Sequence, residues 1–208
     1  MAPASGGDDQ DIPAPAVPEG RLGDWERAES TVETLFELSA ASVRGHTLVY
    51  QDAPLRASVR EATDGRLDQP WRFFFATRLT FRPPLPPGVG QTMVLPTVRS
   101  EAERSFLDDL RDRGFEDLDR GGHERIRIRS GPRARLRKVT GRFHLDAVDR
   151  DLPVEGWVGV WTDGDIHVAG GAYPATSLAS LFDADDDRLA TDPGTYRSEL
   201  LDLIRSVG

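Results

Sequence analysis

The most constraining feature of this sequence is a two-residue alternation of large apolar and basic side chains between Trp71 and Arg82. Trp71, Phe73, Phe75, Leu79 and Phe81 alternate with Arg72, Arg78 and Arg82 in this segment. Successive side chains of a β-strand point to opposite faces of its sheet, so the pattern predicts a strand with one buried face. The fold therefore includes a half-buried sheet.

Similar patterns predict further elements on both sides of this strand. Alternation predicts strands over residues 43–50, 55–61, 124–130, 133–145, 154–162 and 165–173, with a bulge near Arg137 and Lys138. Amphipathic spacing predicts helices over residues 24–38, from Ser100 to just before Gly114, and from Asp192 to the end of the chain. Ser100 with Glu103 forms a capping box, Gly114 suits a left-handed position after a helix, and Asp192 precedes Pro193 at a first turn.

These elements predict an α+β fold in which one mainly antiparallel sheet is packed by amphipathic helices. None of the expected helices is placed as a crossover between parallel strands. Residues 1–23 are rich in Pro and Gly and show no periodicity, so we expect a flexible tail there. Residues 24–208 then form a single domain.

Two short glycine motifs lie in the C-terminal half of the chain. Asp163 and Gly164 separate two apolar segments, which predicts a hairpin with a type I′ turn over residues 154–173. Gly170 and Gly171 follow a strand without opening a helix. We therefore expect close backbone packing or a bulge at these two glycines rather than a phosphate-binding loop.

The charge composition is unusual in kind as well as in sum. The chain has 25 Arg but one Lys, against 23 Asp and 12 Glu, and its formal net charge is −9. Such an acidic, Lys-poor composition is typical of haloarchaeal proteins, where net charge maintains solubility in concentrated salt. A GC-rich genome is the alternative source of the Arg excess. No apolar stretch is long enough to span a bilayer, so we expect a cytoplasmic location or, if a signal or lipid-anchor segment has been removed, the cell envelope. There is no Cys, so cysteine usage does not indicate the redox compartment.

The second half of the chain resembles the PsbP family of photosystem subunits. The resemblance covers residues 100–208 and rests on the segments FLDDLRDRGFEDL, WVGVWTDGDIHVAGGAYP and ELLDLIRSV. It implies an α+β sandwich that serves as a binding or scaffold module without catalysis of its own. Function varies within this family, so the fold alone carries little functional information.

Catalytic and metal-binding motifs are not evident in the sequence. None of the four His stands in an HExxH arrangement, and no cofactor is expected. His144 and Asp146 lie two apart on a predicted strand, so both side chains can face one side. The alternative function is therefore a hydrolase or metal-dependent enzyme with a site gathered around His144, Asp146 and His167. The acidic run over residues 183–187 lacks the full calcium-loop pattern, which favours a solvated loop.

The clearest candidate binding feature is a basic segment in this acidic chain. Residues 125–142 contain eight basic residues and no acidic one. Alternation places Arg125, Arg127 and Arg129 on one face of a strand and Arg133, Arg135 and Arg137 on one face of the next. The expected register pairs Arg129 with Arg133, Arg127 with Arg135 and Arg125 with Arg137.

Two interpretations of these arginines remain open. Opposed like charges destabilise a sheet, so the arginines are neutralised either by acids of this chain or by an external anion. The internal candidates are the glutamates of residues 26–37, the loop of residues 183–187 and the tail. An external partner is an acidic protein or another anionic surface. Nucleic acid is disfavoured because no aromatic side chains are interleaved with the arginines. The sequence thus predicts a non-catalytic binding or scaffold domain.

Overall fold

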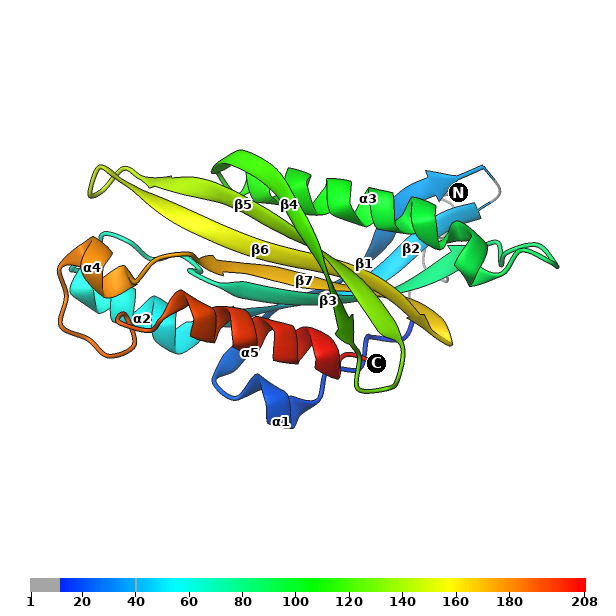
Figure 1. Cartoon of the computed structure of the whole chain (residues 1–208), viewed down its shortest axis with the longest axis horizontal. Coiled ribbons are helices and arrows are strands. Elements are labelled where there is room, and N and C mark those ends of the chain that lie inside the picture. The colour runs from blue at the N-terminus through cyan, green and yellow to red at the C-terminus, as the bar shows by residue number, and fades with distance from the viewer. Residues whose placement is uncertain (1–11, 40) are drawn as a thin grey trace, which may run out of the picture.

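The computed structural model describes residues 12–39 and 41–208, which form one seven-stranded sheet and five helices (Figure 1). The strands are β1 (Trp25–Leu38), β2 (Ala41–Asp52), β3 (Phe73–Arg82), β4 (Phe115–Arg127), β5 (Arg133–Leu145), β6 (Arg150–Asp163) and β7 (Asp165–Pro174). The helices are α1 (Glu19–Leu22), α2 (Ala53–Ala62), α3 (Gln91–Asp112), α4 (Leu178–Phe182) and α5 (Pro193–Ser206). Neighbouring strands are antiparallel throughout, in the order β1-β2-β3-β7-β6-β5-β4. The predicted α+β class is confirmed.

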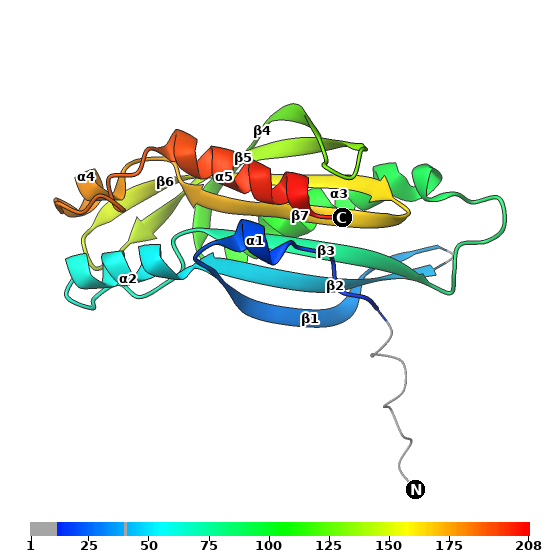
Figure 2. The same ribbon diagram turned by 90° about the horizontal axis from the view of Figure 1, so that it is seen from below.

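Helices cover both faces of the sheet. Apolar residues of α2, α4 and α5 join one core, whereas α3 contributes Val98, Phe106, Leu107 and Leu110 to a second core on the opposite face. Figures 1 and 2 show α3 and α5 on opposite sides of the strands. None of the helices in the described part of the chain is long and apolar enough to cross a membrane.

The two glycines Gly170 and Gly171 allow β7 to approach its neighbours closely. A Cβ atom at Gly171 would lie 2.1 Å from the carbonyl oxygen of Phe73, and one at Gly170 would lie 2.4 Å from that of Trp157. Phe73 pairs with Ala172 in the ladder between β3 and β7, and Trp157 pairs with Gly171 between β6 and β7. Close backbone packing at these glycines, as the sequence predicts, is therefore confirmed.

The predicted helix over residues 24–38 is wrong, because the segment is the edge strand β1. Its pairing with β2 skips one residue at Ala28 and another at Leu35. Each skipped residue is a bulge that shifts the alternation by one position. Val32 and Phe36, two of the four half-buried residues of this strand, are four positions apart in the sequence, but the bulge at Leu35 lies between them and they pair with His46 and Val43, on opposite faces of the sheet. That spacing imitates one face of a helix.

The predicted strand over residues 55–61 is also wrong, because the segment lies within helix α2. Asp52 caps this helix by accepting a hydrogen bond from the Leu55 backbone N–H at 3.0 Å, and a proline occupies its first turn. Leu55 and Val59 are four residues apart and both are buried. Residues four apart are also an even number of positions apart, so the alternation from 55 to 60 fits the buried face of a helix as well as a strand.

Helix α3 begins nine residues earlier than the capping box at Ser100 predicts. Ser100 is exposed in the middle of the helix, and the Glu103 carboxylate contacts Arg137 instead of a backbone N–H. Pro96 lies inside the first two turns of the helix. The predicted end is confirmed, because Gly114 follows the helix with a positive φ of 87°.

The bulge predicted near Arg137 and Lys138 of β5 lies instead in the neighbouring strand β4. The β4–β5 ladder skips Gly121 and Gly122 opposite Lys138, so the irregularity lies in β4, whereas β5 pairs with β6 without interruption. The apolar phase of β5 changes because Leu136 packs into the core beneath α5 and Val139 into the core beneath α3.

Part of the expected N-terminal tail packs against the domain. Ile12 is 4% exposed, Ala16 exchanges two backbone hydrogen bonds with Gly208, and Glu19–Leu22 is helix α1. The tail therefore does not extend to residue 23. Residues 1–11 lie outside the described part of the chain.

A buried arginine joins the start of β1 to β3 and α5. Arg72 is 4% exposed, and its guanidinium carbon lies 4.5 Å from the ring centroids of both Trp25 and Tyr196. Its Nη2 donates to Glu199 Oε2 at 2.6 Å, and its Nη1 lies 3.4 Å from Asp52 Oδ2. The charge of the guanidinium pairs with the two carboxylates, and its planar shape lets it contact the two aromatic rings.

Replacing this arginine tests how much the contact stabilises the fold. We expect Arg72→Gln to lower the free energy of unfolding by about 2 kcal/mol, because two cation–π contacts and a partly buried ion pair are lost. The matched control is Arg56→Gln, since Arg56 pairs with Asp68 at the surface and such pairs contribute about 0.5 kcal/mol. Urea unfolding measures both variants. Equal losses would contradict the role assigned to Arg72.

The hairpin between β6 and β7 turns at Gly164, which has a φ of 75°. Asp163 is not among the residues with positive φ, so the predicted hairpin is present but its turn is not type I′, which requires positive φ at both central residues. Asp163 instead pairs with Asp165 across the turn.

Gly164→Val tests this backbone requirement. A Cβ at Gly164 would meet no atom within 4 Å, so we expect a loss of about 1–2 kcal/mol from backbone strain alone. Gly122→Val is the control, because Gly122 has equally open space without a positive φ. Thermal unfolding that affects the two variants equally would contradict the turn assignment.

Candidate functional site

The predicted arginine ladder forms, but its register is shifted by two residues. Arg127 pairs with Arg133, Arg125 with Arg135, and His123 with Arg137. The predicted pairs of Arg129 with Arg133, Arg127 with Arg135 and Arg125 with Arg137 are therefore wrong.

The turn that joins the two strands explains this shift. The Ile128 backbone N–H donates to the Pro132 carbonyl, and Gly131 N–H donates to the Ile128 carbonyl. Strand β4 ends at Arg127, and the Arg129 N–H donates to the carbonyl of Arg205 in α5. Arg129 therefore belongs to the turn rather than to the strand.

Two of the six arginines form side-chain hydrogen bonds within the described part of the domain. Arg137 Nε donates to Glu103 Oε2 of α3 at 3.0 Å, and Arg137 Nη1 donates to the Gly121 carbonyl. Arg135 Nη2 donates to Nδ1 of His123 at 2.9 Å. Desolvation lowers the pKa of His123, and the charges of Arg137 and Arg135 lower it further. A neutral His123 is the form that accepts this hydrogen bond.

The other four arginines are exposed, and within residues 12–39 and 41–208 they form no ion pair. These are Arg125, Arg127, Arg129 and Arg133. The acidic loop of residues 183–187 contacts Arg150 through Asp183 instead. Whether residues 1–11 contribute an acid lies outside the described residues. We call the exposed side chains of Arg125, Arg127, Arg129, Arg133 and Arg135 the arginine surface.

The arginine surface lies on the α3 side of the sheet. Its strand residues alternate with Ile126, Ala134 and Leu136, which are buried in the core on the α5 side. The backbone that carries the guanidinium groups is therefore held by core packing. These arginines could be identified from the sequence, whereas their pairing across the two strands is seen only in the structure.

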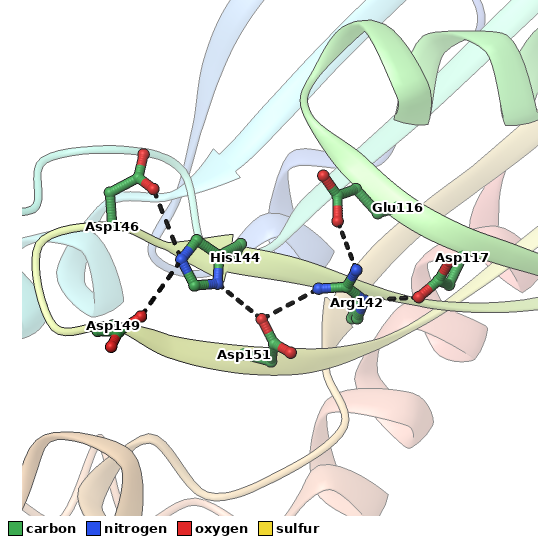
Figure 3. A network of polar contacts seen from close by, with 7 residues as sticks. All are labelled: Glu116, Asp117, Arg142, His144, Asp146, Asp149 and Asp151. Atoms are coloured by element: carbon green, nitrogen blue, oxygen red, sulfur yellow. Dashed lines mark hydrogen bonds and ion pairs between the residues drawn. The ribbon is translucent and has the colours of Figure 1, made fainter.

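A second cluster of charges surrounds His144 near the far end of β5 (Figure 3). His144 Nδ1 lies 2.8 Å from Asp151 Oδ1, and its Nε2 lies 3.6 Å from Asp146 and 3.8 Å from Asp149. Arg142 shares Asp151 and also contacts Glu116 and Asp117. The hydrogen bond to Asp151 raises the pKa of His144, and the same bond lowers the pKa of Asp151.

The sequence-based alternative site around His144, Asp146 and His167 does not assemble. His144 pairs with Asp151 of β6, whereas His167 pairs with Trp161 of the same strand, ten residues further on. Ten residues of strand span roughly 33 Å. His167 is 2% exposed and stacks on Trp161 with 5.7 Å between ring centroids, and burial lowers its pKa. No group of three His, Asp or Glu side chains in the described segments is placed to hold a metal ion.

Sequence reasoning missed a cleft of about 620 Å³ between α3 and strands β1–β3. We call it the α3 cleft. Its floor is mainly apolar and includes Phe73, Phe75, Leu79, Val98, Phe106 and Val168. Its charged lining consists of Glu29 and Glu33 of β1, Asp109 and Asp112 of α3, and Arg113, which directly follows α3. The cleft was not predicted because the sequence pattern of β1, which forms one of its walls, indicates a helix.

A smaller hollow of about 430 Å³ lies beside Arg72 and α1. Several of its charged groups contact one another: Arg72 pairs with Asp52 and Glu199, and Arg188 lies 4.0 Å from Asp24. The arrangement holds the N-terminal segment against α5.

Comparison with known proteins identifies a family without an assigned activity. A family model described as a domain of unknown function, DUF6517, matches residues 14–208. No curated protein matches the chain, and no solved structure does. The resemblance to the PsbP family stays a prediction.

The histidine environments predict a definite order of titration. We expect His144 to have a pKa above the ordinary value of about 6.5, and His123 and His167 to have values below it. Stabilisation by the His144 ion pairs is then complete below the ordinary pKa and is lost as the pH rises through the raised one. Imidazole NMR signals measure all three titrations.

Asp151→Asn isolates the cause of the His144 shift. We expect this variant to move the pKa of His144 back toward its ordinary value and to leave those of His123 and His167 unchanged. A His144 pKa that stays high in Asp151→Asn would show that Asp146 and Asp149 hold the charge instead.

Proposed function

Since the chain belongs to the DUF6517 family, which brings no known activity with it, we propose from its geometry that it is a non-catalytic binding module. Its arginine surface binds an acidic partner protein. The observation that carries this proposal is the pairing of exposed arginines across two strands, Arg125 opposite Arg135 and Arg127 opposite Arg133.

This pairing is unfavourable for the isolated domain. Directly opposed like charges on neighbouring strands cost about 0.2–1 kcal/mol each. The chain has 35 acidic residues and a net charge of −9, yet Arg125, Arg127, Arg129 and Arg133 form no ion pair with any acid of the described segments. An external carboxylate would relieve this repulsion.

The surface is held in position before any partner arrives. Ile126, Ala134 and Leu136 anchor both strands in the core, and the Arg129 N–H bonds to α5. Glu124 of β4 also pairs with Arg197 of α5. Binding therefore orders side chains rather than backbone, which reduces the entropic cost of association.

The chemistry of the surface favours a protein carboxylate partner over nucleic acid. Residues 125–137 contain no aromatic side chain that could stack on a base. Guanidinium groups form bidentate hydrogen bonds with carboxylates, which adds geometric specificity to charge. The acidic, Lys-poor composition supports a halophilic, cytoplasmic origin, and concentrated salt weakens phosphate contacts through counterion release.

A charge-neutralising pair of substitutions tests the proposal. We expect Arg127→Gln with Arg133→Gln to lose retention on immobilised poly-glutamate across a sodium chloride series. We also expect its free energy of unfolding to stay equal or rise by up to about 1 kcal/mol, because an opposed like-charge pair is removed. The control is Arg60→Gln with Arg82→Gln, which removes the same charge from two other exposed arginines.

The outcomes separate the two interpretations of the arginines. Lost stability with unchanged retention would show that the arginines are neutralised within the chain, and would overturn the proposal. Equal loss of retention in the control pair would show that binding follows net charge alone, which also contradicts a specific surface. Tighter retention on RNA than on poly-glutamate would replace the acidic protein with nucleic acid.

A further inference from the structure

The α3 cleft lies apart from the arginine surface, on the other flank of α3. Val98, Ala102, Ser105 and Asp109 of this helix line the cleft, whereas Glu103 contacts Arg137 of β5. Strands β1–β3 and Val168 of β7 form the remaining wall, whereas the arginine surface belongs to β4, β5 and the turn between them. Any ligand of the cleft is therefore distinct from the partner of the arginine surface.

The size and floor of the cleft are those of a small-molecule site. Its volume of about 620 Å³ falls within the range of roughly 300–1,000 Å³ that is typical of such sites. Phe73, Phe75 and Phe106 contribute aromatic rings, and Phe75 and Phe106 lie 5.8 Å apart between centroids. Phe75 and Leu35 keep part of their apolar surface exposed. An apolar body would cover this surface favourably.

The charged lining of the cleft is strongly acidic. Glu29 and Glu33 face it from β1, and Asp109 and Asp112 face it from α3, with Arg113 as the single basic group. Four carboxylates against one guanidinium give a net charge of −3 for the lining. A cleft lined by one sign of charge, with low-dielectric walls, focuses the field and concentrates ions of the opposite sign.

Asp109 is the carboxylate most affected by this environment. The walls of the cleft desolvate it and raise its pKa by more than the Arg113 guanidinium lowers it, and Asp112 and Glu33 raise it further. Its side chain still reaches solvent, and no ion pair to it is formed within the described chain. A cation at Asp109 would offset both the desolvation and the repulsion.

The cleft already holds one cation against an aromatic ring. The Arg113 guanidinium carbon lies 4.8 Å from the ring centroid of Phe73. The combination of an apolar floor, aromatic faces and an acidic lining matches a molecule with an apolar body and a positive charge. We propose that the α3 cleft binds an amphiphilic organic cation, with its apolar body on Phe75 and Phe106 and its charge near Asp109.

The N-terminal segment of the chain is a poor occupant for the same site. Residues 1–11 contain three Asp and no basic residue, so their charge has the same sign as the lining. Ile12 contacts His46 through its carbonyl oxygen. His46 points to the face of β2 opposite Thr47, and Thr47 lines the cleft.

Two ions of nearly equal size and opposite charge test the proposal. We expect titration calorimetry of the full chain in sodium chloride to show saturable binding of tetraphenylphosphonium. Tetraphenylborate should bind more weakly, on the order of tenfold, because it meets the acidic lining. The affinity for tetraphenylphosphonium should also fall as salt is raised.

Two pairs of variants locate the site. Asp109→Asn should weaken tetraphenylphosphonium binding on the order of fivefold, whereas Asp108→Asn removes the same charge from a residue that pairs with Arg111 and should change little. Ser105→Trp should fill the cleft and abolish binding. Arg104→Trp is its control, because Arg104 does not line the cleft.

Each outcome supports or overturns the proposal. Equal affinity for the two ions, or tighter binding of tetraphenylborate, would overturn the preference for a cation. Binding that survives Ser105→Trp unchanged would place the ligand elsewhere, and the absence of saturable binding of both ions would remove the site. None of these results depends on the arginine surface, so the two proposals fail or succeed separately.

Discussion

The pairing of β3 with β7 is the contact on which the rest of this structure depends. The strands β1, β2 and β3 follow one another in the sheet, as do β4, β5, β6 and β7, so all their pairings join strands that are consecutive in the chain. Among the strands of residues 12–39 and 41–208, only the β3–β7 ladder, from Phe73 with Ala172 to Leu79 with Ile166, joins the two halves. Gly171 permits it, since a Cβ there would collide with the Phe73 carbonyl of β3, and a Cβ at Gly170 would meet the ring of Phe75 on β3. Arg72, directly before β3, adds a contact to α5.

This junction also determines where α3 lies. The helix connects β3, the last strand of the first half in chain order, to β4, the first strand of the second half, and it packs across β6 and β7 near the middle of the sheet. It therefore separates two surfaces on the same face. One flank is the acidic α3 cleft beside β1–β3, and the other leads to the arginine surface on β4 and β5. These two surfaces carry opposite charges, and one helix separates them.

The two edge strands share irregular pairing, which makes them difficult to predict from the sequence. Both β1 and β4 contain two register shifts relative to their single partner strand. Bulges are common at sheet edges, where they twist the exposed backbone and discourage pairing with another chain. Each one also moves the alternation by one residue. As a result β1 reads as a helix, and only the last part of β4 reads as a strand.

Local chemistry was enough to determine several elements from the sequence. Residues 133–145 form a strand with the expected bounds, the helix capped by Asp192 is present, and Gly114 ends α3. These signals depend on neighbours within a few residues, such as the alternation of a strand or a side-chain cap. The basic composition of the arginine surface is likewise a property of the sequence alone.

The tertiary structure decided the features that depend on contacts between distant residues. The register that places Arg127 opposite Arg133 follows from the turn at Ile128–Pro132 and from the burial of Ile128. His144 and His167, which the sequence-based alternative groups in one site, pair with positions ten residues apart on β6. The α3 cleft needs β1 to lie opposite α3, and no local pattern specifies this because the order of strands is chosen by packing across the whole core.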